Sequence, residues 1–497
     1  MSINEIIILL LLILYSLILL IPGSKRSGWL NTIPAIIIIV NLIQLLFCGF
    51  KWQLSLVYLL SLVFFLVSFK SLTTLLKRKE SDNPKKTFIR IIGMILGIVI
   101  CYFSIKTLNS FPQFRIPEPT GVYAVGTKYY LFEVPGRESV YRNHAGNNYR
   151  IGIQIWYPAE NSHSEPVFYQ TKKSSECIAS IFDMPGFILN YLSKIKTHSY
   201  HNATPLMSYG PYPIVYYSPG GTGWINQASA VNEELASHGF VVISVGHEST
   251  EPFLRDRDGE VIPLNINNDY AQAINEELYS EAVENIKSRI INCEKIDDKY
   301  ELHQELNQAK PLNVNDMKNR ADNIYFTIDK LLLINKELSG ISDTSAIGIY
   351  GFSKGGAVAG EVCVNSNSVK AGINLDGFMY GDIVEKPLLQ PFMFVHSVSS
   401  DPQAYINDYF FKKAENDAYM MKIKGTTHAN FGDLSLFGGI FKTRGVLGSI
   451  NGERAVEIQR AYVLSFFNRY LKDKNEELLE KDLSEYHEVE ISRKRNK

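Results

Sequence analysis

Four long apolar runs occupy the first 106 residues of the 497-residue chain and limit what this part can fold into. They consist mostly of Ile, Leu, Val and Phe, and each is close to the roughly 17–25 residues that a helix needs to cross about 30 Å of hydrocarbon. The sequence therefore predicts a transmembrane region of four helices within residues 1–108. A cleaved signal peptide is the alternative for the first run, but its leader MSINE has no positive charge and no small-residue cleavage site follows. The runs lie at about residues 5–22, 29–49, 53–69 and 88–106.

Basic residues in the loops between these runs predict the orientation, because Lys and Arg in short loops tend to stay on the cytoplasmic side. The first loop carries Lys25 and Arg26, and the second carries only Lys51. The third loop, residues 70–90, carries seven Lys and Arg residues. The first and third loops are therefore expected inside, and everything after residue 106 on the outer face of the cell membrane.

Charge and cysteine usage argue against several classes of partner. The chain holds 50 basic and 51 acidic residues, so there is no electrostatic reason to expect a nucleic-acid partner. Of its five cysteines, two lie in apolar runs, and the other three lack the spacing of metal ligands. The sequence therefore predicts no disulfide framework, no metal and no cofactor, and it leaves the oligomeric state open.

After a proline-containing connector at residues 109–120, strand-like and helix-like segments alternate over residues 121–472. Such alternation is typical of an α/β protein with a mainly parallel sheet and helices on both faces. The charged segment at residues 473–497 is expected to be a frayed tail. The strand-like runs lie at residues 149–157, 212–218, 239–246, 345–351, 370–375, 391–397 and 418–424. The helix-like segments lie at residues 226–238, 315–338, 354–366 and 453–471.

Residues 249–314 break this alternation with a charged segment that is poor in apolar residues. We expect it to form surface helices inserted between two strands of the sheet. Such an insertion acts either as a cap over a substrate entrance or simply as a solvated surface, and the sequence leaves both interpretations open.

A single serine stands at the predicted junction of a strand and a helix, in the stretch IGIYGFSKGGAVAG. Gly-x-Ser-x-Gly at such a junction forces the serine into a tight, strained turn that exposes its hydroxyl beyond the sheet edge. The helix start that follows supplies backbone N–H groups for a developing negative charge. Ser353 is therefore the predicted nucleophile.

A serine hydroxyl needs a neighbouring base to become nucleophilic at neutral pH. His428, in the loop after the last predicted strand, is the strongest candidate, because the chain order of serine, acid and histidine is that of the α/β-hydrolases. His396 lies inside an apolar strand and reads as a core residue, whereas His247 ends a strand and could line the site. The acid is either Asp376 or Asp401, since each ends a predicted strand, and spacing does not separate them.

Two backbone N–H groups are expected to form an oxyanion hole. One belongs to Lys354, the residue after the nucleophile. The other is expected in the loop PGGTGW after the strand YPIVYYS, where Gly221 fits best because it has no side chain to obstruct a close approach to its backbone.

Several motifs in the same order resemble the platelet-activating-factor acetylhydrolase family of lipase-like α/β-hydrolases. In that family the acid lies in the Leu-Asp motif after the nucleophile helix. The resemblance therefore implies Asp376 as the acid, with Ser353 and His428 completing a triad and Gly221 and Lys354 as oxyanion donors. The motifs, spread over about residues 117–471, are EPTGVYAVGT, QIWYPAE, YPIVYYSPGG, ELASHGFVVISVGHE, GFSKGGAV, NLDGFM and THANFGD.

Two departures from the family pattern put substrate preference in doubt. The loop that often reads Ser-His-Gly is Ser218-Pro219-Gly220 here, and Phe352 stands where His is common. The resemblance does not extend to the four apolar runs.

These features together predict a membrane-anchored serine esterase that hydrolyses carboxylic esters. The resemblance suggests short acyl chains on phospholipids, so that the expected partners are a small-molecule or lipid ester and the membrane itself. An inactive hydrolase-like receptor or binding module is the alternative from another class. A related hydrolase acting on amides or polyesters is the third reading.

Overall fold

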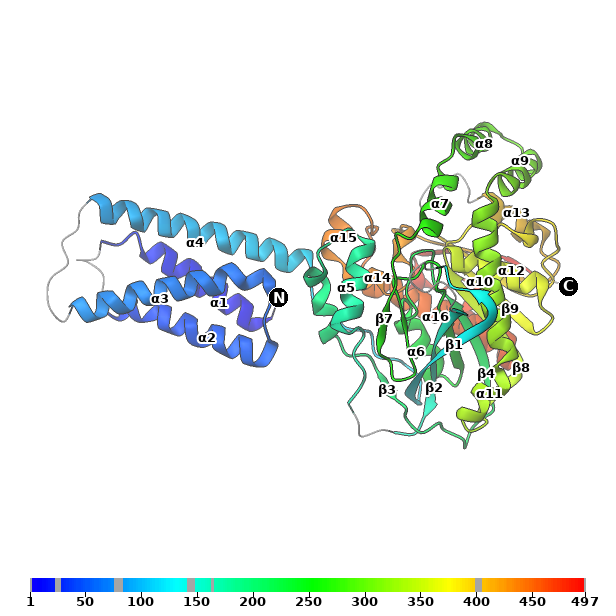
Figure 1. The fold of residues 1–497 in the computed structure, drawn as a ribbon, viewed down its shortest axis with the longest axis horizontal. Coiled ribbons are helices and arrows are strands. Elements are labelled where there is room, and N and C mark those ends of the chain that lie inside the picture. Colours follow the sequence, from blue (N-terminus) through cyan, green and yellow to red (C-terminus); the bar gives the residue numbers. More distant parts are fainter. Residues whose placement is uncertain are drawn as a thin grey trace. The chain divides into compact units, whose positions relative to one another are not determined.

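The computed structural model describes residues 2–22, 28–75, 84–140, 148–161, 165–397 and 405–495, and for residues 70–75 it describes the backbone alone. The chain divides into two compact units, Met1–Gln113 and Phe114–Lys497. The division lies within the predicted connector. Figure 1 shows helices alone in the first unit and a sheet with helices in the second.

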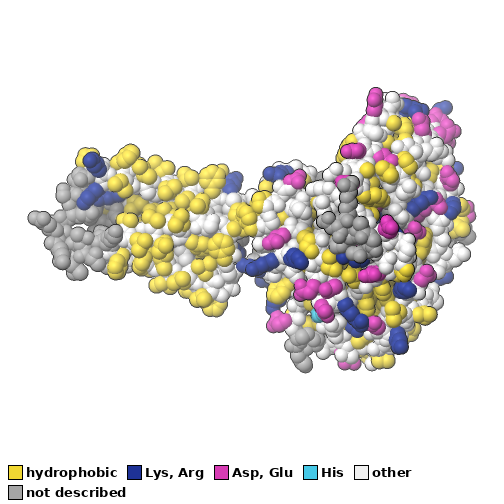
Figure 2. Space-filling view, in the orientation of Figure 1, with side chains coloured by type: hydrophobic (Ala, Val, Ile, Leu, Met, Phe, Trp, Pro, Cys, Tyr) yellow, Lys and Arg dark blue, Asp and Glu magenta, His cyan; other side chains and the backbone are white. Residues whose placement is uncertain are grey.

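The first unit packs its helices around a small apolar interior. Side chains such as Ile8, Leu12 and Ile37 are fully buried there, whereas Leu46 and Phe47 are 81% and 83% exposed. Figure 2 shows apolar side chains covering most of the described surface of this unit on the face in view. Such a surface suits lipid better than water. The helices are α1 (Ile3–Ile18), α2 (Ile33–Cys48), α3 (Ser55–Leu75) and α4 (Pro84–Ser110).

All four predicted runs form helices, but the helices differ in length. Within the part of the chain that the structure describes, three helical segments, Trp29–Cys48, Trp52–Phe69 and Pro84–Ser110, are long and apolar enough to cross a membrane. The helix α1 has 16 residues and is shorter. Four spans therefore stay a prediction. Lys25 and Arg26, and part of the third loop, lie outside the described residues.

The second unit contains a ten-stranded sheet in the order β12-β11-β10-β9-β8-β4-β5-β2-β1-β3. The strands from β11 through β8 and β4 to β5 are parallel, whereas β2 and β12 pair antiparallel with their neighbours β5 and β11. The sheet strands are β1 (Ala124–Glu138), β2 (Asn148–Ala159), β3 (Ser199–His201), β4 (Tyr212–Ser218), β5 (Val241–Val245), β8 (Ser342–Phe352), β9 (Val369–Leu375), β10 (Phe392–Ser397), β11 (Ala418–Ile423) and β12 (Val489–Lys494).

Helices cover both faces of this sheet, and each face has its own apolar core. One core joins the sheet to α10 (Pro311–Asp329), α11 (Leu331–Glu337), α12 (Lys354–Asn365) and α13 (Tyr405–Lys413). The other joins it to α6 (Ser229–Ser237), α16 (Gly452–Lys472) and α17 (Glu477–Glu480). Central strands are buried on both faces, because parallel strands need cover on each side. The remaining short helices include α5 (Lys172–Ile181), α14 (Leu434–Phe437) and α15 (Gly439–Thr443).

The predicted strands appear as β2, β4, β5 and β8 to β11, and the predicted helices as α6, α10 with α11, α12 and α16. The strands β1, β3 and β12 were not predicted. The expectation of a frayed tail is wrong for Glu477–Glu480, which form α17, and for Val489–Lys494, which form the edge strand β12. In β12, Val489 and Ile491 alternate with the polar residues Glu490 and Ser492 and pack against the apolar core, a period of two that suits a strand.

The insertion between β5 and β8 contains a small hairpin, β6 (Phe253–Arg255) and β7 (Val261–Pro263), and then helices. The helices α7 (Asp269–Leu278), α8 (Glu281–Asn292) and α9 (Ile296–Ala309) precede α10. Val283, Ile286, Ile290 and Leu306 give α8 and α9 a small core of their own. In Figure 1 this pair lies at the periphery of the second unit.

Candidate active site

Ser353 lies in a sharp turn between β8 and α12 and has φ 55° and ψ −122°. A non-glycine residue at positive φ is strained by about 1–3 kcal/mol and persists only where the surroundings enforce it. The glycines on either side of Ser353 permit this turn, because they have no Cβ that would collide with the neighbouring backbone. A Cβ on Gly355 would lie 2.0 Å from the Ser218 carbonyl oxygen, and one on Gly351 would lie 2.1 Å from the Gly355 oxygen. The motif therefore packs the turn directly against the end of β4.

A continuous chain of hydrogen bonds leads from Ser353 to a carboxylate. His428 Nε2 lies 2.9 Å from Ser353 Oγ, and His428 Nδ1 lies 2.8 Å from Asp376 Oδ2. The carboxylate favours the tautomer with its proton on Nδ1, which leaves Nε2 to accept from the serine hydroxyl. The imidazole is 49% exposed, so a substrate can approach it.

Asp376 follows β9 and is held on both sides. Its Oδ1 accepts the Ser397 N–H at 2.6 Å, and its backbone also has positive φ, at 54°. Burial raises the pKa of the Asp376 carboxyl, but the hydrogen bonds from His428 and from the Ser397 N–H outweigh burial and leave this pKa below its ordinary value. The carboxyl group is therefore ionised at neutral pH and able to hold the imidazole.

Of the two candidate acids, Asp376 is the one whose position relative to His428 the structure describes. Asp401 lies outside the described residues. Ser353, Asp376 and His428 follow the carboxyl ends of the parallel strands β8, β9 and β11, respectively. Ligands bind at this edge in open α/β sheets.

The two rival histidines are both buried and neither contacts Ser353. His396 lies in β10, as the sequence predicted, and its Nδ1 is 4.0 Å from Asp376 Oδ1. His247 follows β5, accepts a hydrogen bond on Nδ1 from Asn323 Nδ2 at 2.9 Å, and lies 3.2 Å from Ser218 Oγ through Nε2. Burial, followed by the cations of Arg320 and other neighbours, holds the pKa of His247 well below its usual range.

The expected oxyanion donors lie on the two chain segments that meet at the turn. Lys354 is the first residue of α12, where backbone N–H groups have no partner within the helix. Gly221 follows β4, and a Cβ placed on it would meet nothing within 4 Å. Among the residues that the structure describes, neither backbone N–H donates a hydrogen bond. Both groups are thus available to an incoming ligand.

Phe352, which departs from the family pattern, packs beside the candidate base. Its ring centroid lies 4.9 Å from that of His428, and it also stacks on Phe431. The ring therefore confines the imidazole on one side. Pro219 stands where the sequence comparison with the family pattern expected a histidine, and the hydroxyl of the preceding Ser218 contacts His247.

Sequence reasoning did not single out several polar residues near the site. Asn374 bonds the Gly377 backbone through both side-chain atoms and so shapes the turn that carries Asp376. Asp316 and Arg320, on α10, contact the Lys354 side chain and the loop after β4. The sequence around Asp316 and Arg320 has the polar pattern of a solvent-exposed helix. Their opposite charges at i, i+4 spacing were the one sequence signal that the two side chains interact.

The described residues offer no cluster of three or more His, Cys, Asp or Glu side chains arranged to hold a metal ion. The chemistry that the site can support from its own residues is nucleophilic attack by a hydroxyl, proton transfer through an imidazole, and binding of an oxyanion by backbone N–H groups.

The mainly parallel sheet with a serine on the strand-to-helix turn defines an α/β-hydrolase. A solved structure with this fold, the ferulic acid esterase from Streptomyces cinnamoneus, superposes with a TM-score of 0.59 at 23% identity, over 76% of this chain and 99% of that one. The chain belongs to the family described as "Platelet-activating factor acetylhydrolase, isoform II", whose family model matches residues 108–488.

Individual relatives agree with this assignment. The platelet-activating factor acetylhydrolase of Cavia porcellus is 25% identical over 74% of this chain and 81% of its own length. The platelet-activating factor acetylhydrolase of Canis lupus familiaris is 23% identical over 73% of this chain and 78% of its own length. A protein of Arthroderma benhamiae named "Probable 1-alkyl-2-acetylglycerophosphocholine esterase" is 28% identical over 32% of this chain and 46% of its own length. The predicted family resemblance and the predicted enzyme class, a carboxylic ester hydrolase, are confirmed.

Proposed function

We propose that this protein is a membrane-anchored serine esterase that forms an acyl-enzyme on Ser353. The observation that carries the proposal is the unbroken hydrogen-bond chain from Ser353 Oγ through His428 to Asp376. A strained, accessible serine that contacts an imidazole, itself oriented by an ionised carboxylate, has the geometry that nucleophilic catalysis requires.

In the first half-reaction Ser353 Oγ attacks the carbonyl carbon of the ester while His428 Nε2 takes the hydroxyl proton. The carbonyl oxygen becomes an oxyanion, to which the N–H groups of Gly221 and Lys354 donate. The intermediate then collapses, the C–O bond to the alcohol breaks, and His428 returns its proton to the leaving alcohol. Asp376 stays ionised and stabilises the imidazolium throughout.

In the second half-reaction water replaces the alcohol. His428 Nε2 removes a proton from the water, and the resulting hydroxide attacks the acyl carbon. Collapse of this second oxyanion breaks the bond to Ser353 Oγ, which recovers its proton from His428. The products are a carboxylic acid and the free enzyme, and no other co-reactant is needed.

The substrate proposed here is a phospholipid ester with a short acyl chain. The names of the relatives, acetylhydrolases of platelet-activating factor, support this class of substrate. The apolar helices of the first unit support attachment to a bilayer, which would concentrate lipid esters near the enzyme. We place the second unit on the outer face of the cell membrane, because the basic residues of the first and third loops favour the cytoplasm.

A fluorophosphonate probe tests the nucleophile. We expect the probe to label the full-length protein in detergent or lipid, and the label to disappear in Ser353→Ala. Folded protein without Ser353-dependent labelling would point to an inactive receptor or binding module instead.

A panel of substrates tests the class of ester. We expect turnover of glycerophospholipids with acetyl to short acyl chains, falling as the chain lengthens. Higher turnover of amides or polyesters than of any acyl ester would favour the related hydrolase classes.

Exposure of intact cells to protease tests the orientation of the second unit. Cleavage within residues 249–314 is expected in intact cells, and cleavage only after lysis would reverse the proposed orientation.

A further inference from the structure

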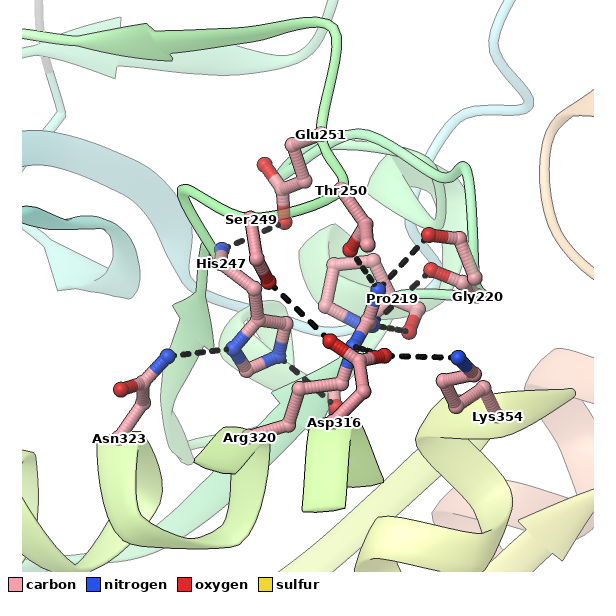
Figure 3. A network of polar contacts seen from close by, with 12 residues as sticks. Pro219, Gly220, His247, Ser249, Thr250, Glu251, Asp316, Arg320, Asn323 and Lys354 are labelled. Carbon is pink, nitrogen blue, oxygen red and sulfur yellow. Dashed lines mark hydrogen bonds and ion pairs between the residues drawn. The ribbon is translucent and has the colours of Figure 1, made fainter. Parts of the chain in front are cut away.

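A fully buried arginine holds the loop that follows β4 (Figure 3). Arg320, on α10, donates from Nη1 to the carbonyl oxygens of Pro219 at 3.2 Å and Gly220 at 3.1 Å. Its Nη2 donates to the Gly221 oxygen at 2.7 Å and to Thr250 Oγ1. Three successive carbonyl groups are thus gathered around one guanidinium.

This arrangement fixes the direction of the Gly221 N–H. In a trans peptide, the C=O and N–H groups of one peptide unit point in opposite directions. Arg320 draws the Gly220 carbonyl toward α10, and the Gly221 N–H belongs to that same trans peptide unit. The N–H is therefore directed away from α10, and it donates to none of the described residues.

A single carboxylate connects this loop to the turn that carries the nucleophile. Asp316, one helical turn before Arg320, accepts a hydrogen bond from Lys354 Nζ at 2.7 Å on Oδ2. The same oxygen lies 3.4 Å from Arg320 Nε, and Oδ1 accepts from Ser249 Oγ at 3.2 Å. Because Lys354 follows Ser353, Asp316 joins the segments that contribute the two proposed oxyanion donors. The dashed lines in Figure 3 trace this path.

The charges of the cluster also favour an anion. Arg320 and Lys354 are opposed by the one carboxylate of Asp316 in direct contact with them. His247 is uncharged because burial and Arg320 hold its pKa well below its usual range. Burial raises the pKa of Glu251 to about 8, so this carboxyl is mostly protonated at neutral pH. Burial also lowers the pKa of Lys354, whereas Asp316 acts in the opposite direction. Two basic side chains, Arg320 and Lys354, thus share the Asp316 carboxylate beneath the loop.

We propose that Arg320 and Asp316 are positioning residues of the oxyanion hole: Arg320 turns the Gly221 N–H toward the reacting carbonyl, and Asp316 fixes its separation from the Lys354 N–H. The inference rests on the proposed esterase function and deepens it. Neither side chain touches the substrate, and both act through the backbone groups that they hold. Preorganised donors of this kind stabilise the transition state more than the bound substrate.

The test compares this arginine with a second buried arginine, whose hydrogen bonds within the described residues go to Glu234 and Glu118 and not to the proposed site residues. Arg460, on α16, is 7% exposed, donates to Glu234 Oε2 at 3.0 Å from Nε and binds the Glu118 carbonyl oxygen at 2.7 Å. The variants Arg320→Lys, Arg320→Met, Asp316→Asn and Arg460→Met are made in the full-length protein. Each is assayed for kcat and KM with p-nitrophenyl acetate, for inhibition by a trifluoromethyl ketone, and for thermal unfolding.

We expect Arg320→Met to lower kcat about 10²-fold, the lower end of the effect of deleting an oxyanion donor, with KM changed by less than about threefold. The trifluoromethyl ketone binds as a tetrahedral oxyanion, so its affinity should fall by a similar factor. Arg320→Lys keeps the charge and should recover part of the loss. Arg460→Met should lower the unfolding temperature and leave kcat and ketone affinity unchanged.

The inference is overturned if folded Arg320→Met and Asp316→Asn keep the kcat and the ketone affinity of the wild type. It is also overturned if these substitutions change KM alone. If Arg320→Met does not fold, Lys354→Met tests the inference in its place. This substitution removes the side chain that Asp316 binds and keeps the backbone N–H of residue 354. An unchanged kcat in Lys354→Met also overturns the inference. Failure of the esterase proposal looks different, since the wild-type protein would then show neither turnover nor Ser353 labelling.

Discussion

Two serine–histidine pairs lie at the same edge of the sheet, and they differ in almost every other respect. Ser353 and His428 follow β8 and β11, are accessible, and are 2.9 Å apart. Ser218 is the last residue of β4 and His247 follows β5; both are fully buried, and they are 3.2 Å apart. The outer histidine is oriented by the Asp376 carboxylate, the inner one by the amide of Asn323.

The difference predicts that a serine–histidine contact is not by itself enough for catalysis. The amide donates to Nδ1 of the inner histidine, so the proton of that neutral ring lies on Nε2 and its serine faces a donor. The carboxylate imposes the opposite tautomer on the outer histidine, whose Nε2 can accept a proton. The inner pair thus supports the fold, whereas the outer pair has the arrangement of a nucleophile with its base.

The largest expected difference between the pairs is in turnover. Ser353→Ala should lower kcat by about 10⁴ to 10⁶-fold, because among the described residues Ser353 supplies the hydroxyl that bonds to the base. Ser218→Ala, the matched control, should stay within about tenfold of the wild type, a change of 1.36 kcal/mol or less in the barrier. Steady-state ester hydrolysis measures both. Equal losses in two folded variants would remove the distinction between the pairs.

The next largest effect comes from giving the outer histidine an amide partner like that of the inner one. Asp376→Asn should lower kcat by about 10⁴-fold, because the amide stabilises the tautomer that cannot accept the serine proton. Turnover over a pH range and thermal unfolding separate this effect from misfolding. Full activity in Asp376→Asn, with loss in Asp401→Asn, would reassign the acid.

A smaller effect is expected at the inner histidine, and mainly on stability. His247→Gln should lower the free energy of unfolding by about 1–3 kcal/mol, because buried polar partners lose their geometry. Its kcat should stay within about tenfold of the wild type, in contrast to His428→Gln. Denaturant unfolding and ester hydrolysis are the measurements. A loss of kcat as large as that of His428→Gln would show that the inner pair takes part in the reaction.

Measured per pH unit, the smallest effect is a pH dependence of stability beside the inner pair. Burial raises the pKa of Glu251 from 4.5 to about 8, against the opposing effects of Arg320 and the His247 N–H. Because the folded-state pKa is raised, the stability associated with the protonated group is present below about pH 4.5 and lost as pH rises toward about 8. Relative to Glu251→Gln, the wild type should lose up to about 1.4 kcal/mol of unfolding free energy per pH unit in this window. Parallel unfolding curves for the two proteins from pH 5 to 8 would contradict the protonated state.

Much of the candidate site could be predicted because its determinants are local. The glycines around Ser353 specify a turn that only small residues permit, and the motif alone indicates it. His428 could be predicted because it follows a parallel strand, and the ends of such strands share an edge. Asp376 and Asp401 could not be separated by spacing, since both follow strands at that edge, and the family resemblance was needed.

What could not be predicted depends on contacts between distant parts of the chain. Arg320 is separated from Gly221 by about a hundred positions, and nothing in the polar pattern of α10 indicates that it is fully buried. The edge strand β12 was missed because its charged residues resemble a solvated tail. Only its pairing with β11 and the packing of Val489 and Ile491 explain its order.

The strand β12 also matters for how the protein behaves in solution. It pairs along β11 and so covers hydrogen-bonding groups that would otherwise be free at that margin of the sheet. The family match ends at residue 488, so this cover comes from residues beyond the matched region. A chain cut after residue 488 would expose β11 as a template for strand addition and self-associate, whereas an affinity tag added after Lys497 leaves that margin closed.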